Sequence, residues 1–175
     1  MAHSITITLD TAALTTSVAT EIYKWGQANK DDANYQRIYH LQYGANDNVD
    51  VALVKQFIKQ RANRIADIVS EYLTEIVFGS NVNPIGPNNP EPDPFQPAPP
   101  TTEENYVVYN MTLPGGWNMK TYDNLVKLFE DYTIDGAASD WFANAGVKQA
   151  EVMAQRAAGH AIGIQRNIYH KNSTI

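Results

Sequence analysis

NMKTYDNLVKLFEDYTIDGAASDWFANAGVKQAEVMAQRAAGHAIGIQRNIY, residues 118–169, is the segment around which the rest of this 175-residue chain is predicted to pack. Asn118 can cap a first helix, because its short side chain accepts a hydrogen bond from a free backbone N–H of the first turn. Gly146 marks the end of that helix, so the chain is expected to turn at residues 143–146. Apolar side chains recur there at steps of three and four, the spacing of one helical face: Tyr122, Leu125, Val126, Phe129, Ile134, Ala137, Trp141 and Phe142.

The second half of the segment predicts another helix, whose apolar face carries mostly small side chains. Gly159 and Gly163 lie close to that face, and small residues let two helix backbones approach closely. The pattern favours a helical hairpin that closes its own core. The alternative is a face that binds a neighbouring copy of the chain. The residues of the face are Val147, Ala150, Ala154, Ala157, Ala158, Ala161, Ile162 and Ile168.

Composition predicts one folded domain over residues 1–175. Hydrophobic residues make up 43% of the chain and charged residues 18%, whereas an ordinary globular domain has about 25% charged residues. The low charged fraction suggests that partners cover part of the surface. The net charge of −6 argues against a general nucleic-acid-binding face, since phosphate neutralisation needs clustered Lys and Arg.

Cysteine is absent from the sequence. This excludes a disulfide scaffold, a thiolate metal site and a cysteine nucleophile. The first four residues show no basic region followed by an apolar core, so we expect no signal peptide. We also expect no membrane span, because no run of about 18 apolar residues occurs.

The N-terminal quarter predicts a strand followed by a helix. Residues 4–10 alternate, with Ile5, Ile7 and Leu9 on one side, which is the pattern of a half-buried strand. Residues 12–27 follow as a helix that Asp10 or Thr11 can cap. Residues 28–48 are polar and are expected to form a loop with one short helix at residues 34–42.

Residues 47–77 carry a strong helical period, with apolar residues from Val51 to Ile76 on one face. Counted from Val49 this is about 28 residues, or about 43 Å of helix. The charges beside the apolar face are basic in the first half and acidic in the second, an order that opposes the helix dipole. Those charges therefore either contact partners or simply face solvent.

A proline-rich insertion is predicted at residues 83–102. Eight of the nine prolines lie between Pro84 and Pro100. Because proline lacks a donor N–H and fixes φ, we expect a long extended loop with its own task or a spacer role. PxxP spacings occur in it, but the flanking arginine of an SH3-type ligand is missing.

A second strand is predicted at residues 104–113, with Val107, Tyr109, Met111 and Leu113 on one face. Paired antiparallel with residues 4–9, it makes a two-stranded β-ribbon, which a strand from another chain would complete. The predicted fold is therefore mainly α: a helical bundle of about four helices, a small two-stranded β-ribbon and a long proline-rich extended loop.

Chemical motifs are weak throughout. His3, His40, His160 and His170 share no metal-ligand spacing, so we expect no metal site and no cofactor. Residues 46–50 have the oxygen density of a calcium loop but lack its glycine and closing glutamate. Serines lack a nucleophile-elbow setting and no phosphate-binding loop occurs. We therefore expect the chain not to be an enzyme.

The order of these segments resembles small structural proteins of tailed bacteriophages and prophages of Bacteroidetes, including crAss-like phages. The resemblance rests on Leu113-Pro114, on residues 131–137 (DYTIDGA), on Asp140-Trp141-Phe142 and on residues 164–170 (IQRNIYH). It covers about two thirds of the chain and rests mainly on the order of segments: an opening strand, a long helix, a variable loop, a strand ending in Leu-Pro, a helix with a late Trp and an Ala-rich helix with a basic, aromatic tail. The proline-rich insertion departs from it.

The resemblance implies a head-to-tail connector or adaptor of the virion neck. Such a subunit forms a homo-oligomeric ring, commonly twelvefold, between the portal protein and further neck or tail proteins, around the channel through which packaged DNA passes. Negative charge lining that channel would let DNA slide without adhering. We expect the subunit interface to use Ile5, Ile7, Pro90, Pro94, Phe95, Pro97, Val107, Tyr109, Ala150, Ala154, Ala158 and Tyr169.

Two alternatives stay open at this point. The chain is either another virion component, such as a tail-completion or capsid-associated protein, or a bacterial helical module with a peptide-binding or regulatory role. In the second case the proline-rich insertion would be a docking ligand.

Overall fold

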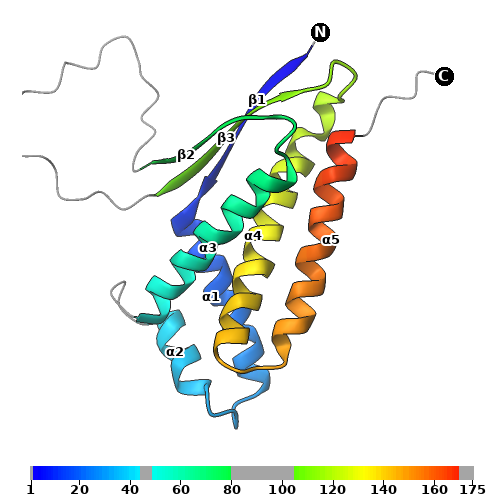
Figure 1. Cartoon of the computed structure of the whole chain (residues 1–175). Coiled ribbons are helices and arrows are strands. Elements are labelled where there is room, and N and C mark those ends of the chain that lie inside the picture. The colour runs from blue at the N-terminus through cyan, green and yellow to red at the C-terminus, as the bar shows by residue number, and fades with distance from the viewer. Residues whose placement is uncertain (1, 44–48, 80–104, 170–175) are drawn as a thin grey trace, which may run out of the picture.

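The computed structural model describes residues 2–43, 49–79 and 105–169, which contain five α-helices, one 3₁₀ turn and three β-strands. The helices lie side by side along the long axis, and the strands form a small sheet toward one end (Figure 1). The prediction of a mainly helical chain is thus confirmed. None of the helices in these ranges combines the length and the apolar character needed to cross a membrane.

The chain begins with strand β1, His3–Asp10, and helix α1, Thr11–Ala28. Ile5, Ile7 and Leu9 are buried and the residues between them are exposed, as the alternation predicts. Asp10 is the cap of α1: its Oδ1 accepts from the N–H groups of Ala12 and Ala13 at 2.8 and 3.0 Å. Helix α2, Tyr35–Tyr43, is the short helix expected at residues 34–42.

Helix α3 spans Val49–Ile68 and strand β2 spans Leu73–Gly79, so the single helix predicted over residues 47–77 is wrong in its last third. The chain turns between the two elements, where the N–H groups of Tyr72 and Leu73 both donate to the carbonyl of Val69. The helix is therefore too short to reach beyond the body of the molecule.

A β-bulge explains this error. Leu73 pairs with Met111 and Ile76 pairs with Tyr109, and the register shifts between Leu73 and Glu75. A bulge adds one residue to a strand, so two inward side chains lie three residues apart instead of two. A step of three is also a helical step, and the sequence pattern therefore continued the helix into the strand.

Strand β3, Tyr106–Leu113, is the centre of an antiparallel sheet with the order β1-β3-β2. The predicted pairing of the first strand with β3 is confirmed, and it sets Ile7 opposite Tyr109. The expected two-stranded ribbon is a three-stranded sheet, and the third strand, β2, comes from the same chain. A strand from another chain is not needed to complete it.

The organising segment forms the 3₁₀ turn η1, Met119–Thr121, and the helices α4, Tyr122–Asn144, and α5, Gln149–Tyr169. Asn118 caps η1, since its Oδ1 accepts from the N–H of Lys120 at 3.1 Å. Gly146 has a φ of 71°, a conformation that glycine adopts easily. The predicted hairpin is confirmed, with its junction at residues 145–148, two residues later than the predicted 143–146.

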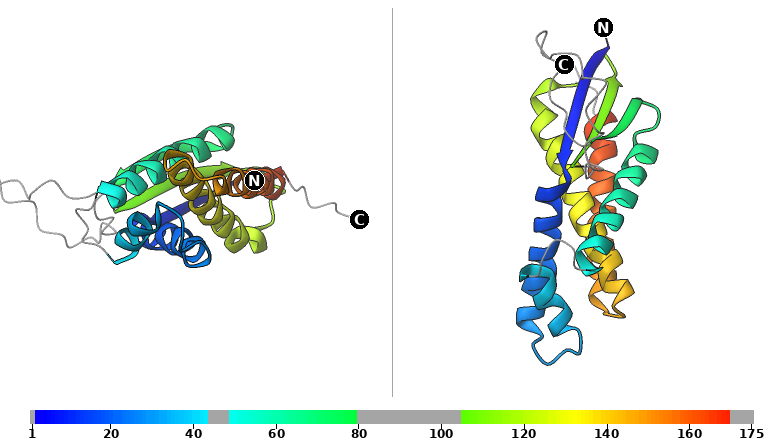
Figure 2. Two further views of the ribbon diagram at one scale, coloured as in Figure 1. Left: turned by 90° about the horizontal axis from the view of Figure 1, so that it is seen from below. Right: turned by 90° about the vertical axis from the view of Figure 1, so that its left-hand side faces the viewer.

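Helix α4 lies at the centre and packs against α1, α3 and α5 (Figure 2). Phe129, Trp141 and Phe142 are almost fully buried along it. Arg61 of α3 reaches α4 and forms two hydrogen bonds with the Asp140 carboxylate, at 2.7 and 2.5 Å. This ion pair links α3 directly to α4.

Candidate subunit-interface surfaces

Four residues that were expected at a subunit interface lie in the core of the chain: Ile5, Ile7, Val107 and Tyr109. The Tyr109 hydroxyl donates to the carbonyl of Ala62 in α3 at 3.0 Å, and its ring meets the Phe129 ring of α4 edge-on. Burial, together with the nearby Tyr132, raises the pKa of Tyr109. These side chains are not available to a neighbour, because the strands direct them toward α3 and α4.

Four further residues of the expected interface, Pro90, Pro94, Phe95 and Pro97, lie outside the described residues, as does the whole insertion at residues 83–102. Their proposed role as an arm between subunits stays a prediction.

The small residues of α5 serve the hairpin on their inner side. Ala157 is buried, and Ala150 is half-buried with its carbonyl accepting from the Ser139 hydroxyl of α4 at 2.8 Å. A Cβ at Gly163 would lie 2.9 Å from a methyl carbon of Leu128 in α4, which is closer than side chains tolerate. The expectation that this helix closes its own core is confirmed on this side.

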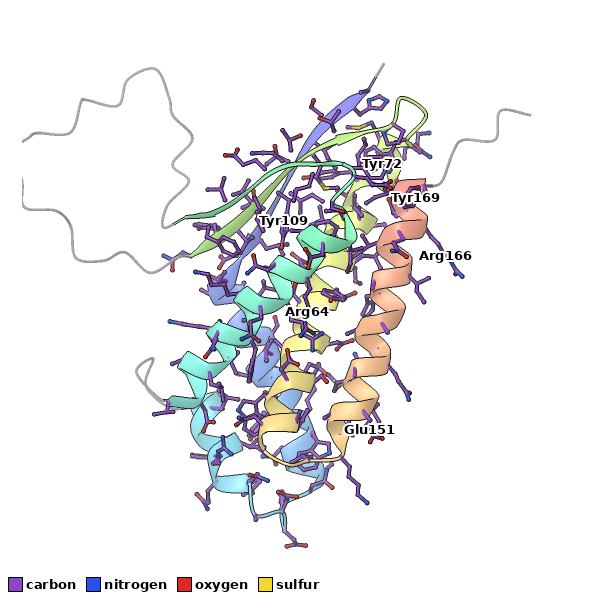
Figure 3. All side chains as sticks on the ribbon, viewed as in Figure 1. Arg64, Tyr72, Tyr109, Glu151, Arg166 and Tyr169 are labelled. Atoms are coloured by element: carbon purple, nitrogen blue, oxygen red, sulfur yellow. The ribbon has the colours of Figure 1, made fainter. Side chains whose placement is uncertain are left out.

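The opposite side of α5 faces solvent, and we name it the α5 outer face. The exposed fractions of three large residues on it are 49% for Val152, 49% for Ile162 and 52% for Tyr169. The centre of the face carries few charges, and Figure 3 shows Glu151 and Arg166 toward its two ends. Ala154 and Ala158, expected at the interface, are exposed here. The face consists of Glu151, Val152, Ala154, Gln155, Ala158, Gly159, Ile162, Gln165, Arg166 and Tyr169.

Tyr169 is held in place although half of it is exposed. Its hydroxyl donates to the Glu71 carboxylate at 2.8 Å, and its ring meets the Tyr72 ring edge-on at 5.5 Å (Figure 3). The hydrogen bond to Glu71 is the main cause that raises the pKa of Tyr169 to about 12. The last turn of α5 is thereby tied to the connection between α3 and β2.

A buried carboxylate connects three helices at the side of α5 nearest α1. Asp135 of α4 is 2% exposed, and its Oδ2 lies 3.1 Å from both Arg156 Nε and His160 Nε2 of α5. Arg156 also approaches Glu21 of α1 at 3.9 Å. Burial raises the pKa of Asp135, against the opposing effects of Arg156 and His160.

The groove around Asp135 has a volume of about 410 Å³ and holds positive and negative side chains in balance. Sequence reasoning missed this cluster because its members come from α1, α4 and α5 and share no spacing. The available signal was an aspartate within the apolar stripe of the first organising helix. Glu21, Lys24, Lys127, Asp131, Asp135, Arg156 and His160 line the groove. Such a neutralised cluster holds the three helices together. Within the described ranges, no group of three His, Asp or Glu side chains is arranged to hold a metal ion.

Carboxylates also gather between β1 and α4. Asp123, Glu130 and Asp131 line a groove of about 390 Å³ there, beside Lys127. The Tyr122 hydroxyl donates to the carbonyl of Thr6 at 2.6 Å and so fixes the start of α4 to β1. This surface presents the acidic side chains of α4 to solvent.

An apolar cavity of about 450 Å³ lies where α1 begins, between α3 and the sheet. Ile58, Phe78 and Val107 line it, together with Lys55 and Lys59. The Lys59 ammonium lies 5.1 Å from the centre of the Phe78 ring, a cation–π distance. Apolar side chains and two lysines therefore line the same cavity.

No family model, curated protein or solved structure matches this chain. Its surfaces are therefore interpreted from their own geometry.

Proposed function

We propose that the chain is a structural subunit of the neck of a tailed bacteriophage, a connector or adaptor that forms a ring between portal and tail. The observation that carries this proposal is the α5 outer face. It exposes Val152, Ile162 and Tyr169 on a chain with only 18% charged residues. Exposed apolar side chains that share one helix face are a feature of interaction sites, and a virion subunit has neighbours on several sides.

The order of the elements supports the proposal. β1 opens the chain, β3 ends at Leu113 before Pro114, Trp141 lies near the end of α4, and α5 is rich in alanine. This is similar to the order of the phage proteins that the sequence resembles, in which one long helix stands where this chain has α1, α2, α3 and β2. α1, α3, α4 and α5 would act as a four-helix bundle that carries load between two layers of the virion.

The proposed mechanism is mechanical and electrostatic. Identical head-to-tail contacts between subunits close into a ring. We propose that the groove between β1 and α4 faces the channel, because Asp123, Glu130 and Asp131 line it. Carboxylates there would repel the phosphate backbone, so that DNA passes without binding.

Light scattering of the purified chain, alone and with candidate portal proteins, tests the proposal. A species of ring size, or a monomer that assembles only with a portal, is the expected result. Deleting residues 83–100 should then abolish assembly if the proline-rich insertion joins subunits. If the chain stays monomeric with every portal protein tested, with or without residues 83–100, the ring is refuted.

The apolar cavity favours a second candidate, a helical module that binds peptides. Phe78 and Val107 would receive an apolar side chain, and Lys55 and Lys59 an acidic one. Titration of the monomer with acidic proline-rich peptides, read from the fluorescence of a labelled peptide, tests it. Saturable binding that Phe78→Ala removes would favour this function over the ring.

A further inference from the structure

The two ends of the α5 outer face carry opposite charges. Glu151 lies in the first turn of α5 and Arg166 in the last. They are about 22 Å apart along the helix. Neither side chain forms an ion pair with another residue in the described ranges. Both signs suit the helix dipole, but the dipole does not explain the apolar surface between them.

We propose that the α5 outer face binds the same face of a second copy of the chain, with the two helices antiparallel. A twofold axis through the middle of α5 brings Glu151 of one copy against Arg166 of the other, and the pair occurs twice. The same register sets Ala158 opposite Gly159 and Gln155 opposite Ile162. The face is thus complementary to itself in charge and in size.

The centre of this contact is suited to close approach. Ala158 and Gly159 lie there, and a Cβ at Gly159 would meet nothing within 4 Å. Helix axes pack about 8–10 Å apart, with the smaller distances where side chains are small. A crossing angle of about 20° keeps both ends of the helices in contact. Val152 and Ile162 then lose exposure on both copies.

A parallel arrangement does not fit the same face. It would set Glu151 against Glu151 and Arg166 against Arg166, and like charges in close contact repel. The two helix dipoles would also point the same way. An antiparallel pair removes both conflicts, so the charges favour the antiparallel orientation of the two helices.

The contact is small. Helix α5 is about 32 Å long, and a face about 10 Å wide gives about 300 Å² from each copy, or about 600 Å² in all. Stable interfaces bury about 1,200 Å² or more, so the dimer should be weak and need micromolar or higher concentration. The inference does not rest on the proposed ring. If both hold, the α5 outer face joins two rings with dihedral symmetry, and the head-to-tail contacts within each ring use other surfaces of the chain.

Disulfide cross-linking tests the register, and the chain helps because it has no cysteine of its own. In the antiparallel pair, Gln155 faces Ile162 of the other copy, while two copies of Gln155 are about 10 Å apart along the axis. That exceeds the roughly 7 Å that a disulfide spans. Gln155→Cys and Ile162→Cys should therefore each stay monomeric on oxidation, and an equal mixture should form a covalent heterodimer. Cross-linking of either variant alone, or no cross-linking of the mixture, would overturn the proposal.

Charge reversal tests the ends. Sedimentation at increasing concentration should show dissociation constants raised on the order of tenfold for Glu151→Arg and for Arg166→Glu. A mixture of these two variants should associate better than either alone, because every facing pair is then attractive. Asp123→Arg, which lies on α4 away from the α5 outer face, is the matched control and should leave the dissociation constant of the dimer unchanged. An unchanged dissociation constant in both variants, or no gain in the mixture, would contradict the antiparallel pair. Light scattering of the chain with a portal protein measures ring assembly independently of these dissociation constants. Failure of the dimer and failure of the ring can therefore be told apart.

Discussion

Gly136→Ala is expected to destabilise the chain although alanine favours helices. Gly136 lies in the middle of α4, beneath the side chain of Arg61. A Cβ there would lie 2.7 Å from Cδ and 2.8 Å from Nε of Arg61. That Nε also donates to Asp140 at 2.7 Å, so the guanidinium cannot move away and keep its partner.

Two effects of opposite sign decide the outcome. Alanine in place of glycine in a helix interior contributes about 1 kcal/mol of stability. The Arg61 and Asp140 side chains are only 11% and 23% exposed, and breaking such a buried pair costs about 3–5 kcal/mol. The free energy of unfolding should therefore fall by about 2–4 kcal/mol.

Urea denaturation followed by far-UV circular dichroism measures this change as a lower midpoint at constant slope. Gly159→Ala is the matched control, because Gly159 also lies inside a helix but has open space around its Cβ position. At dilute, monomeric concentration the control should gain up to about 1 kcal/mol.

A double-mutant cycle checks the cause. In an Arg61→Ala background the added methyl group of Gly136→Ala has no guanidinium to displace, and the substitution should become neutral or stabilising. The reasoning fails if Gly136→Ala is as stable as Gly159→Ala, or if its cost persists without Arg61.

Three smaller predictions concern single contacts. Asp10→Ala should lower the free energy of unfolding by about 1 kcal/mol, because two N–H groups of α1 lose their acceptor; urea denaturation measures it, and Asp10→Ser should restore most of it. Trp117→Phe should cost about 1–3 kcal/mol in the same assay, since the buried indole N–H that donates to the Asn167 carbonyl is lost. Asp135→Asn should keep its stability at neutral pH. Because the folded-state pKa of Asp135 is raised above 3.8, the wild type should lose stability as pH rises from that value through the folded-state pKa. Thermal denaturation across this range should show no such loss in the variant, whose uncharged amide still faces Glu21, Arg156 and His160.

The parts of the fold that local patterns determine were predictable. Asp10 before an apolar helical period marks the start of α1, and Gly146 between two such periods marks the hairpin of α4 and α5. The pairing of β1 with β3 followed from alternation in the only two strands that were recognised. Each of these features depends on residues close together in the sequence, where backbone preference and side-chain period agree.

The parts that depend on tertiary contacts were not predictable. β2 was taken for helix because its bulge spaces Leu73 and Ile76 like a helix. Ile7 and Tyr109 were assigned to an interface because a two-stranded ribbon would have left them uncovered, whereas both are fully buried and Tyr109 contacts Ala62 of α3 and Phe129 of α4. Asp135 meets Arg156 and His160 only once the hairpin closes.

Gly159 connects the fold to the proposed dimer, because no contact among the described residues requires a glycine at this position. At Gly163 a side chain would meet the methyl groups of Leu128 in α4, so glycine there lets the two helices of the hairpin pack closely. At Gly159 nothing lies within 4 Å, and glycine costs about 1 kcal/mol relative to alanine in a helix. A close contact with another copy supplies the missing reason. Gly159→Leu should therefore stabilise the monomer against urea, since leucine is a good helix former, while it weakens the dimer by separating the two helices. Cross-linking of Gln155→Cys with Ile162→Cys, each also carrying Gly159→Leu, measures the second effect. A folding defect would lower both the stability against urea and the cross-linking yield. If the variant is more stable yet cross-links as before, the argument from Gly159 fails.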